Sequence, residues 1–215
     1  MWFFIWIVLS SILLGSAAWS LQILLRQKKA WEAYAKSKNF NFVRGTFMGP
    51  AEMSGVIGDY KVSLFSVERT SDDVRSRRMM TSLEIELVEP IVDGMAMGTK
   101  EMLPFMQSIG TLKPTKIENP GWDETLFAFV RHEASIKAYL TPERLDCFIN
   151  LLKTRNADVI IVFNDQKLAI RLETPDPMQD TAKMEKIVSR ILGLLDKIRL
   201  TPEQRAQYAA LKDSA

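Results

Sequence analysis

The hydrophobic pattern of the chain begins with a long apolar run that contains no ionisable side chain. This run extends from Trp2 to Leu25, and Gln22 is its only amide. As a helix that rises about 1.5 Å per residue, a run of this length spans a hydrocarbon core of about 30 Å. The pattern therefore predicts a transmembrane helix over residues 1–25.

A cleaved signal peptide is the alternative for this run, because Ser16, Ala17 and Ala18 offer small residues for a cleavage site. However, no basic segment precedes the run, and its apolar residues continue past this point. We therefore favour an anchor that stays in place. Within it, Ser11 and Gly15 form a small-x-x-x-small pair, which permits close helix packing and a homo-oligomer, although such pairs are also common without a function.

Positive charge follows the apolar run directly. Arg26, Lys28 and Lys29 lie just after it, whereas only the α-amino group precedes it. The cytoplasmic flanks of membrane helices carry an excess of lysine and arginine. We therefore expect the N-terminus to lie outside, the remaining residues to be cytoplasmic, and these three side chains to contact the membrane interface.

Residues 26–39 continue the helical pattern beyond the membrane. Ala30, Trp31, Tyr34 and Ala35 fall on one stripe, with lysines around it. One interpretation is a connector that packs its tryptophan face on the domain, and the other is a helix that lies on anionic headgroups through its lysines. We favour the connector, because a strand pattern starts almost at once after it.

After this helix, alternating apolar and polar positions predict strands with helices between them. The clearest strand is at 80–88, where Leu83, Ile85 and Leu87 alternate with polar residues. A Gly-Asp turn at 58–59 predicts a hairpin. Further strands are expected at 40–42, 126–130, 158–164 and 167–173, and helices at 141–152 and 187–198.

Runs of strands with interspersed helices, and few parallel βαβ units, indicate an α+β fold. We predict that the transmembrane helix precedes a mainly antiparallel sheet domain with packed helices over 40–200, and a tail over 201–215 that starts with a capping-box pattern. Residues 91–121 are rich in Gly, Pro and Met and lack a sustained period, so we expect a loop or a subdomain boundary there. A short helix over 100–109 is expected to break near Pro104.

The composition describes an ordinary globular protein attached to this anchor. The 215 residues are 47% hydrophobic and 25% charged, and the formal net charge is +2. This balance does not indicate nucleic acid as a partner. The single cysteine, Cys147, excludes an intramolecular disulfide.

His132 and Cys147 are the only histidine and the only cysteine in the chain, and they raise the question of a nucleophilic dyad. Cys147 falls beside the apolar stripe of a predicted helix, where a cysteine behaves as a small hydrophobe. His132 falls at the end of a predicted strand. We therefore interpret the two residues as a packed cysteine and a surface histidine. One His and one Cys also cannot supply the usual ligands of structural zinc.

Two further patterns imitate catalytic or binding motifs. The sequence GMAMGTK at 94–100 imitates a phosphate-binding loop, but its glycines are too closely spaced and its Thr precedes its Lys. Glu84, Glu86 and Glu89 suggest paired carboxylates, but a spacing of two puts the first two on the ordinary polar face of a strand. We predict no catalytic residue, no cofactor and no metal.

An arginine cluster is the most unusual feature of the predicted surface. Arg75, Arg77 and Arg78 lie between two predicted strands, next to Asp72 and Asp73. The favoured interpretation is a hairpin loop whose charges neutralise one another. The alternative is a contact for an anionic lipid or an acidic partner, because guanidinium groups bind phosphate and carboxylate in a bidentate manner.

Short structural motifs occur along the chain in a recognisable order. They are Trp31 and Ala35 in the connector, Gly55 and Gly58 before Val62, the pair Trp122-Asp123, and Leu140-Thr141-Pro142 at a helix start. In this order the chain resembles a group of bacterial membrane-anchored proteins known only as domains of unknown function. The resemblance implies a single span with an α+β cytoplasmic domain, and it supplies no catalytic residues.

These observations together predict a non-enzymatic, single-pass protein of the bacterial inner membrane. Its cytoplasmic domain is expected to act as a protein-interaction or scaffold module. The expected partners are the lipid bilayer and another membrane or membrane-proximal protein. Two alternatives stay open, namely a membrane-proximal sensor or ligand-binding module with a pocket around 91–121, and an enzyme of unknown reaction.

Overall fold

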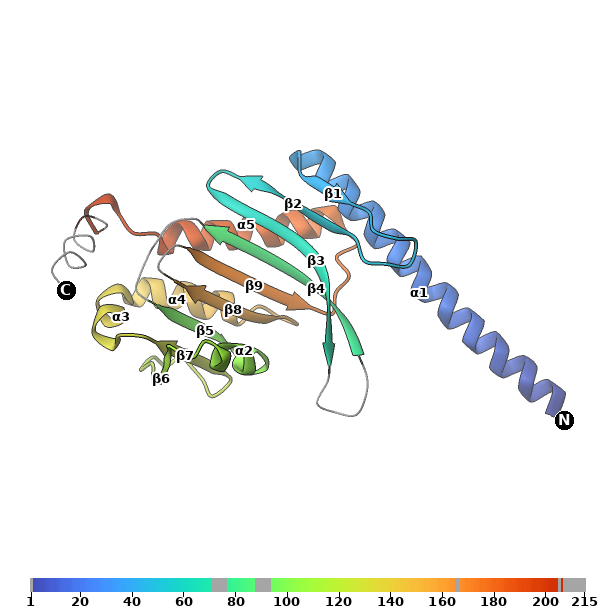
Figure 1. The fold of residues 1–215 in the computed structure, drawn as a ribbon, viewed down its shortest axis with the longest axis horizontal. Helices are drawn as coiled ribbons and strands as arrows, with labels where there is room; N and C mark the ends of the chain where they lie inside the picture. Colours follow the sequence, from blue (N-terminus) through green and yellow to red (C-terminus); the bar gives the residue numbers. More distant parts are fainter. Residues whose placement is uncertain (1, 71–76, 88–93, 165–166, 205, 207–215) are drawn as a thin grey trace.

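A computed structural model describes residues 2–70, 77–87, 94–164, 167–204 and 206 of the chain. It begins with α1, Trp2–Lys38, one continuous helix whose N-terminal part projects away from the remaining elements (Figure 1). Within the described ranges, α1 is the one helix that is long and apolar enough to cross a membrane. The predicted transmembrane segment and the helix predicted to continue from it both belong to α1, as the uninterrupted helical pattern implied.

The strands form one antiparallel sheet, and the fold is α+β as predicted. The described residues contribute nine strands in the spatial order β1-β2-β3-β4-β9-β8-β5-β7-β6, and each neighbouring pair is antiparallel. Their bounds are β1 Asn41–Val43, β2 Glu52–Ile57, β3 Tyr60–Thr70, β4 Arg77–Leu87, β5 Met95–Thr99, β6 Lys113–Thr115, β7 Leu126–Val130, β8 Asp158–Phe163 and β9 Leu168–Thr174.

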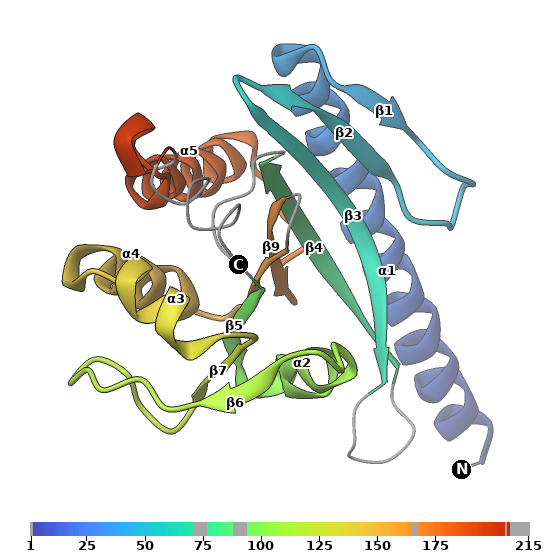
Figure 2. The ribbon, with the colours of Figure 1, turned by 60° about the vertical axis from the view of Figure 1, so that its left-hand side comes forward.

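Helices cover the two faces of this sheet unequally (Figures 1 and 2). The C-terminal part of α1 and three later helices share the main core with one face. The later helices are α3 Glu133–Tyr139, α4 Pro142–Leu152 and α5 Thr181–Ile198. The opposite face carries a 3₁₀ turn, η1 Lys100–Met102, and α2 Leu103–Ser108, which pack over β5, β7 and β8. We call this second face the open face, because the described helices leave its β3, β4 and β9 part uncovered.

Local sequence signals explain most of these elements. In β4, Leu83, Ile85 and Leu87 alternate into the main core, as a half-buried strand requires. The β2–β3 hairpin turns at Gly58, whose φ of +57° suits glycine. Thr141 caps α4 by accepting the Arg144 backbone N–H at 3.3 Å. The capping box predicted at the start of the tail also forms, through two reciprocal bonds between Thr201 and Gln204.

The segment expected to be a loop or a boundary contains a central strand. Residues 95–99 form β5, which lies between β7 and β8 in the middle of the sheet. Both of its faces are covered, so its residues do not alternate, and the period that would reveal a half-buried strand is missing. The short helix exists as η1 and α2, but Pro104 lies in the first turn of α2 and does not break it. Residues 91–93 fall outside the described ranges.

Candidate functional site

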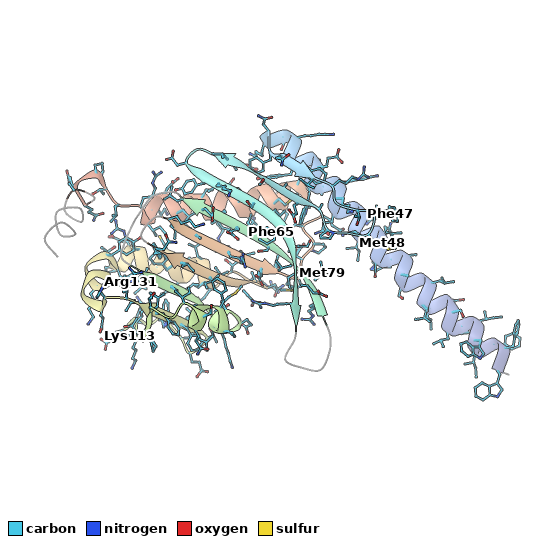
Figure 3. All side chains as sticks on the ribbon, viewed as in Figure 1. Phe47, Met48, Phe65, Met79, Lys113 and Arg131 are labelled. Carbon is cyan, nitrogen blue, oxygen red and sulfur yellow. The ribbon has the colours of Figure 1, made fainter. Side chains whose placement is uncertain are left out.

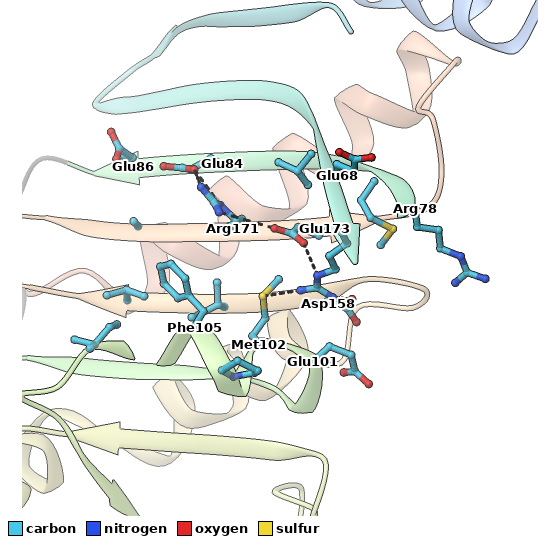
Figure 4. A pocket seen from close by; sticks show the side chains of 18 of the residues that line it. Glu68, Arg78, Glu84, Glu86, Glu101, Met102, Phe105, Asp158, Arg171 and Glu173 are labelled. Carbon is cyan, nitrogen blue, oxygen red and sulfur yellow. Dashed lines mark hydrogen bonds and ion pairs between the residues drawn. The ribbon is translucent and has the colours of Figure 1, made fainter. Parts of the chain in front are cut away.

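A cleft of about 1130 Å³ lies on the open face, between the β3–β4 hairpin and α2 (Figure 4). Its floor is formed by outward-facing side chains of β4, β9 and β8. We call it the sheet cleft. The residues that line it are Val67, Glu68, Arg69, Arg78, Met80, Glu84, Glu86, Glu101, Met102, Pro104, Phe105, Ile109, Asp158, Ile160, Val162, Asn164, Lys167, Ala169, Arg171 and Glu173.

Arg69 connects three parts of the sheet cleft. Its guanidinium lies 2.6 Å from a carboxylate oxygen of Asp158 on β8 and 3.1 Å from one of Glu173 on β9. It also lies 3.1 Å from the sulfur of Met102. In the sheet, β4 lies between β3 and β9. Arg69 on β3 can reach β9 and β8 because the end of β3 curves over the open face (Figures 1 and 4).

A second set of ion pairs follows the strand register. Glu84 on β4 lies directly opposite Arg171 on β9, and its carboxylate accepts two hydrogen bonds from that guanidinium, at 3.0 and 3.2 Å. The same guanidinium lies 5.6 Å from the centre of the Phe65 ring. Glu86 accepts a hydrogen bond from Lys167, and the Lys61 ammonium lies 3.6 Å away. Neighbouring strands are therefore joined by their side chains as well as by their backbones.

The electrostatic field of the sheet cleft has an acidic excess. Six carboxylates and four cationic side chains line it, which leaves two negative charges uncompensated within the lining. Burial raises the pKa of Asp158, and the nearby charge of Glu101 raises it further, although Arg69 opposes both effects. By contrast, the hydrogen bond from Lys167 lowers the pKa of Glu86.

The sheet cleft also presents apolar surface beside these charges. Met102, Pro104, Phe105 and Ile109 line one wall of the cleft. Phe105 is half exposed at this wall. The arrangement combines apolar contacts with charged groups along the strands, and this combination suits an extended amphipathic polypeptide.

The predicted arginine cluster is only partly described. Arg75 lies outside the described residues, and Arg77 is the first residue of β4. Arg78 is exposed at the edge of the sheet cleft. β4 therefore starts three residues before the strand predicted at 80–88, and β3 ends at Thr70.

The three residues expected at the membrane interface take different positions. Arg26 and Lys29 are exposed on α1. Lys28 is instead buried, and its ammonium donates hydrogen bonds to the carbonyls of Thr46 and Phe47. Both Ser11 and Gly15 are exposed on the projecting part of α1, as a packing contact between copies would require.

The residues that suggested a dyad, paired carboxylates or a phosphate loop lie apart or take part in ordinary packing and ion pairs. Cys147 is buried in the main core, whereas His132 is exposed and directly precedes α3, a helix that the pattern did not predict. Glu84 and Glu86 each pair with their own cation, and Glu89 is outside the described ranges. The sequence that imitates a phosphate loop forms β5. In the part of the chain that the structure describes, no group of His, Cys, Asp or Glu is arranged to hold a metal ion.

Sequence reasoning missed the convergence of Arg69, Asp158 and Glu173. Each residue has an ordinary place on a strand, and 89 residues separate the first two in the chain. Only strand order and curvature bring them together, so no local motif signals them.

Comparisons with protein-family models, with curated proteins and with solved structures returned no match. The resemblance to bacterial membrane-anchored proteins therefore stays a prediction. What the molecule itself defines is an α+β domain joined to one N-terminal apolar helix, with a charged cleft on the open face of its sheet.

Proposed function

We propose that this chain is a non-enzymatic, single-pass protein of the bacterial inner membrane, with its N-terminus outside and its domain in the cytoplasm. In this proposal the domain binds a segment of another protein in the sheet cleft. The observation that carries the proposal is an open, amphipathic cleft in a domain that packs directly on the apolar helix.

The contacts between α1 and the domain support a role for the helix in positioning the cleft. Trp31 is fully buried, and its indole N–H donates to the Met178 carbonyl at 3.2 Å. The Gln179 amide donates to the carbonyl of Ile23 at 3.0 Å, close to the end of the apolar run. An anchor of this kind holds the cleft near the bilayer and raises its local concentration for membrane-proximal partners.

The size and charge of the sheet cleft favour a polypeptide over a small molecule. Small-molecule sites bury most of the surface of their ligand in a cleft or cavity lined mainly by apolar side chains. The sheet cleft, of about 1130 Å³, is instead lined by ten charged side chains together with apolar ones, over β3, β4, β8 and β9. Its acidic excess favours a partner segment that carries Lys or Arg beside apolar residues.

Site-specific photo-crosslinking in cells tests this function. A photoreactive residue in place of Phe105, at the cleft wall, is expected to capture a discrete partner through a basic, apolar segment. The matched control replaces Val56, an exposed apolar residue of β2 outside the cleft lining. It is expected to capture none of the proteins that are captured at position 105. The substitution Glu101→Lys should reduce capture at position 105, because its change of two charges cancels the acidic excess of the lining.

Three results would contradict the proposal. The first is the same captured protein at positions 56 and 105, and the second is capture that Glu101→Lys leaves unchanged. The third is a C-terminal reporter that is active only outside the cytoplasm, because it would place the domain on the other side of the membrane.

A further inference from the structure

Two large apolar side chains stand exposed at the tip of the loop between β1 and β2. Phe47 is 66% exposed and Met48 is 73% exposed. Both lie beside α1 (Figure 3), near the place where the helix leaves its apolar run. Adjacent apolar side chains exposed in this way are typical of a surface that contacts another phase or molecule.

Lys28 holds this loop against α1. Its ammonium donates to the carbonyl of Thr46 at 2.6 Å and to that of Phe47 at 3.2 Å. The loop is also braced internally, because the Gly49 N–H donates to the Thr46 hydroxyl at 2.9 Å. The positions of the two exposed side chains relative to the helix are therefore defined.

The level of the loop along α1 coincides with the expected membrane surface. Lys28 follows Leu25, the last residue of the apolar run, by three positions, which is about 4.5 Å of helix rise. The side chains of Phe47 and Met48 are long enough to cross that distance. Lys28 is buried and its ammonium is bonded to two carbonyls, so at this level the exposed side chains belong to the loop and not to the lysine.

Positive charge surrounds this apolar tip. Arg26 and Lys29 are exposed on α1, and Arg44 is exposed at the start of the loop. Apolar residues with cations beside them are the usual pattern of a segment that lies in an anionic membrane interface.

We propose that the β1–β2 loop is a second membrane contact, which inserts Phe47 and Met48 into the interface of an anionic leaflet beside α1. This inference rests on the proposed role of α1 as the anchor. The second contact fixes the tilt of the domain on the bilayer, and therefore the direction in which the sheet cleft faces.

Depth-dependent fluorescence quenching on the full chain tests the contact. In a Cys147→Ala background, Met48→Cys carries an environment-sensitive fluorophore in vesicles of phosphatidylethanolamine and phosphatidylglycerol, with a lipid that bears a nitroxide near its headgroup. Quenching at position 48 is expected to exceed severalfold that at Val56→Cys. Val56 is the matched control, because it is also exposed and apolar but lies next to the β2–β3 turn, at the far end of the sheet from the N-terminus of α1 (Figure 1).

A third probe separates the two proposals. Leu14→Cys places the fluorophore near the middle of the apolar run, so a lipid that bears its nitroxide at the end of an acyl chain should quench it if α1 spans the bilayer. Quenching at position 14 with equal, weak quenching at 48 and 56 would overturn the loop contact and leave the anchor intact. No quenching at position 14 would overturn the anchor itself. In addition, Phe47→Asp should lower quenching at position 48, and an unchanged signal would contradict insertion of the loop.

Discussion

Arg69 is the residue whose loss should disturb the sheet cleft most. The substitution Arg69→Met keeps much of the apolar stem and removes the charge. Among the described residues, it leaves Glu173 with Arg171 as its neighbouring cation, whose closest nitrogen is 3.9 Å away. The side chain of Glu173 is only 7% exposed, so water cannot replace the lost partner.

The expected cost follows from the burial of this ion pair. Removing one partner of a buried pair costs about 3–5 kcal/mol. The side chains of Arg69 and Asp158 keep 29% and 23% of their exposure, which allows water to offset part of the loss. We therefore expect the free energy of unfolding to fall by about 2–4 kcal/mol.

The effect should also depend on pH. Burial already raises the pKa of Asp158, and without Arg69 this pKa should rise further. A carboxyl group with a higher pKa in the folded protein favours folding below its unfolded pKa, and this contribution is lost as the pH rises through the folded value. The loss in free energy of unfolding caused by Arg69→Met should therefore be larger at about pH 7 than near pH 4.

Denaturant unfolding of the full chain in mild detergent, followed by far-ultraviolet circular dichroism, measures these effects. The double variant Arg69→Met with Glu173→Gln should recover about 1 kcal/mol or more, because it removes the stranded charge. The matched control is Lys61→Met, whose side chain is 58% exposed and which should cost less than about 1 kcal/mol. An equal cost for Arg69→Met and Lys61→Met would show that the ion pairs of Arg69 stabilise the fold no more than an exposed pair does.

Three further substitutions test other parts of the fold in the same unfolding assay. Trp31→Ala should lower the free energy of unfolding by about 3–5 kcal/mol, because it leaves a cavity between α1 and the domain. A loss below about 1 kcal/mol, which is typical of a surface change, would show that this contact does not stabilise the domain. Gly55→Ala should cost about 1–3 kcal/mol, because the added methyl group would overlap the ring of Phe40; a neutral result would mean that the ring moves freely. Thr141→Ala should cost about 1 kcal/mol through the lost cap of α4, whereas Thr141→Ser should keep the stability if the hydroxyl is what matters.

The strongest sequence predictions concern segments whose neighbours in the chain set their environment. The apolar run of α1, the Gly58 turn, the alternation of β4 and the Thr141 cap all depend on spacing over a few residues. Periodicity and capping chemistry act at that range, so these elements could be predicted. The packed state of Cys147 also followed from its place beside a helical apolar stripe.

Other features depend on contacts between segments that are distant in the chain. β5 has no alternating pattern because both of its faces are covered, and only the neighbouring strands and α2 supply that cover. The position of Lys28 just after the apolar run predicts a contact with the membrane interface. Its ammonium instead donates a hydrogen bond to a loop carbonyl eighteen residues later in the chain. The sheet cleft depends on the curvature that carries Arg69 over β4 to Asp158 and Glu173.

For this protein, local periodicity accounts for the long apolar helix, most of the other elements and the α+β class. The open face, the cleft on it and the loop beside α1 exist only after strands distant in the chain have paired. The charged side chains of the cleft and the loop meet their partners through that strand pairing, which no spacing of residues along the chain encodes.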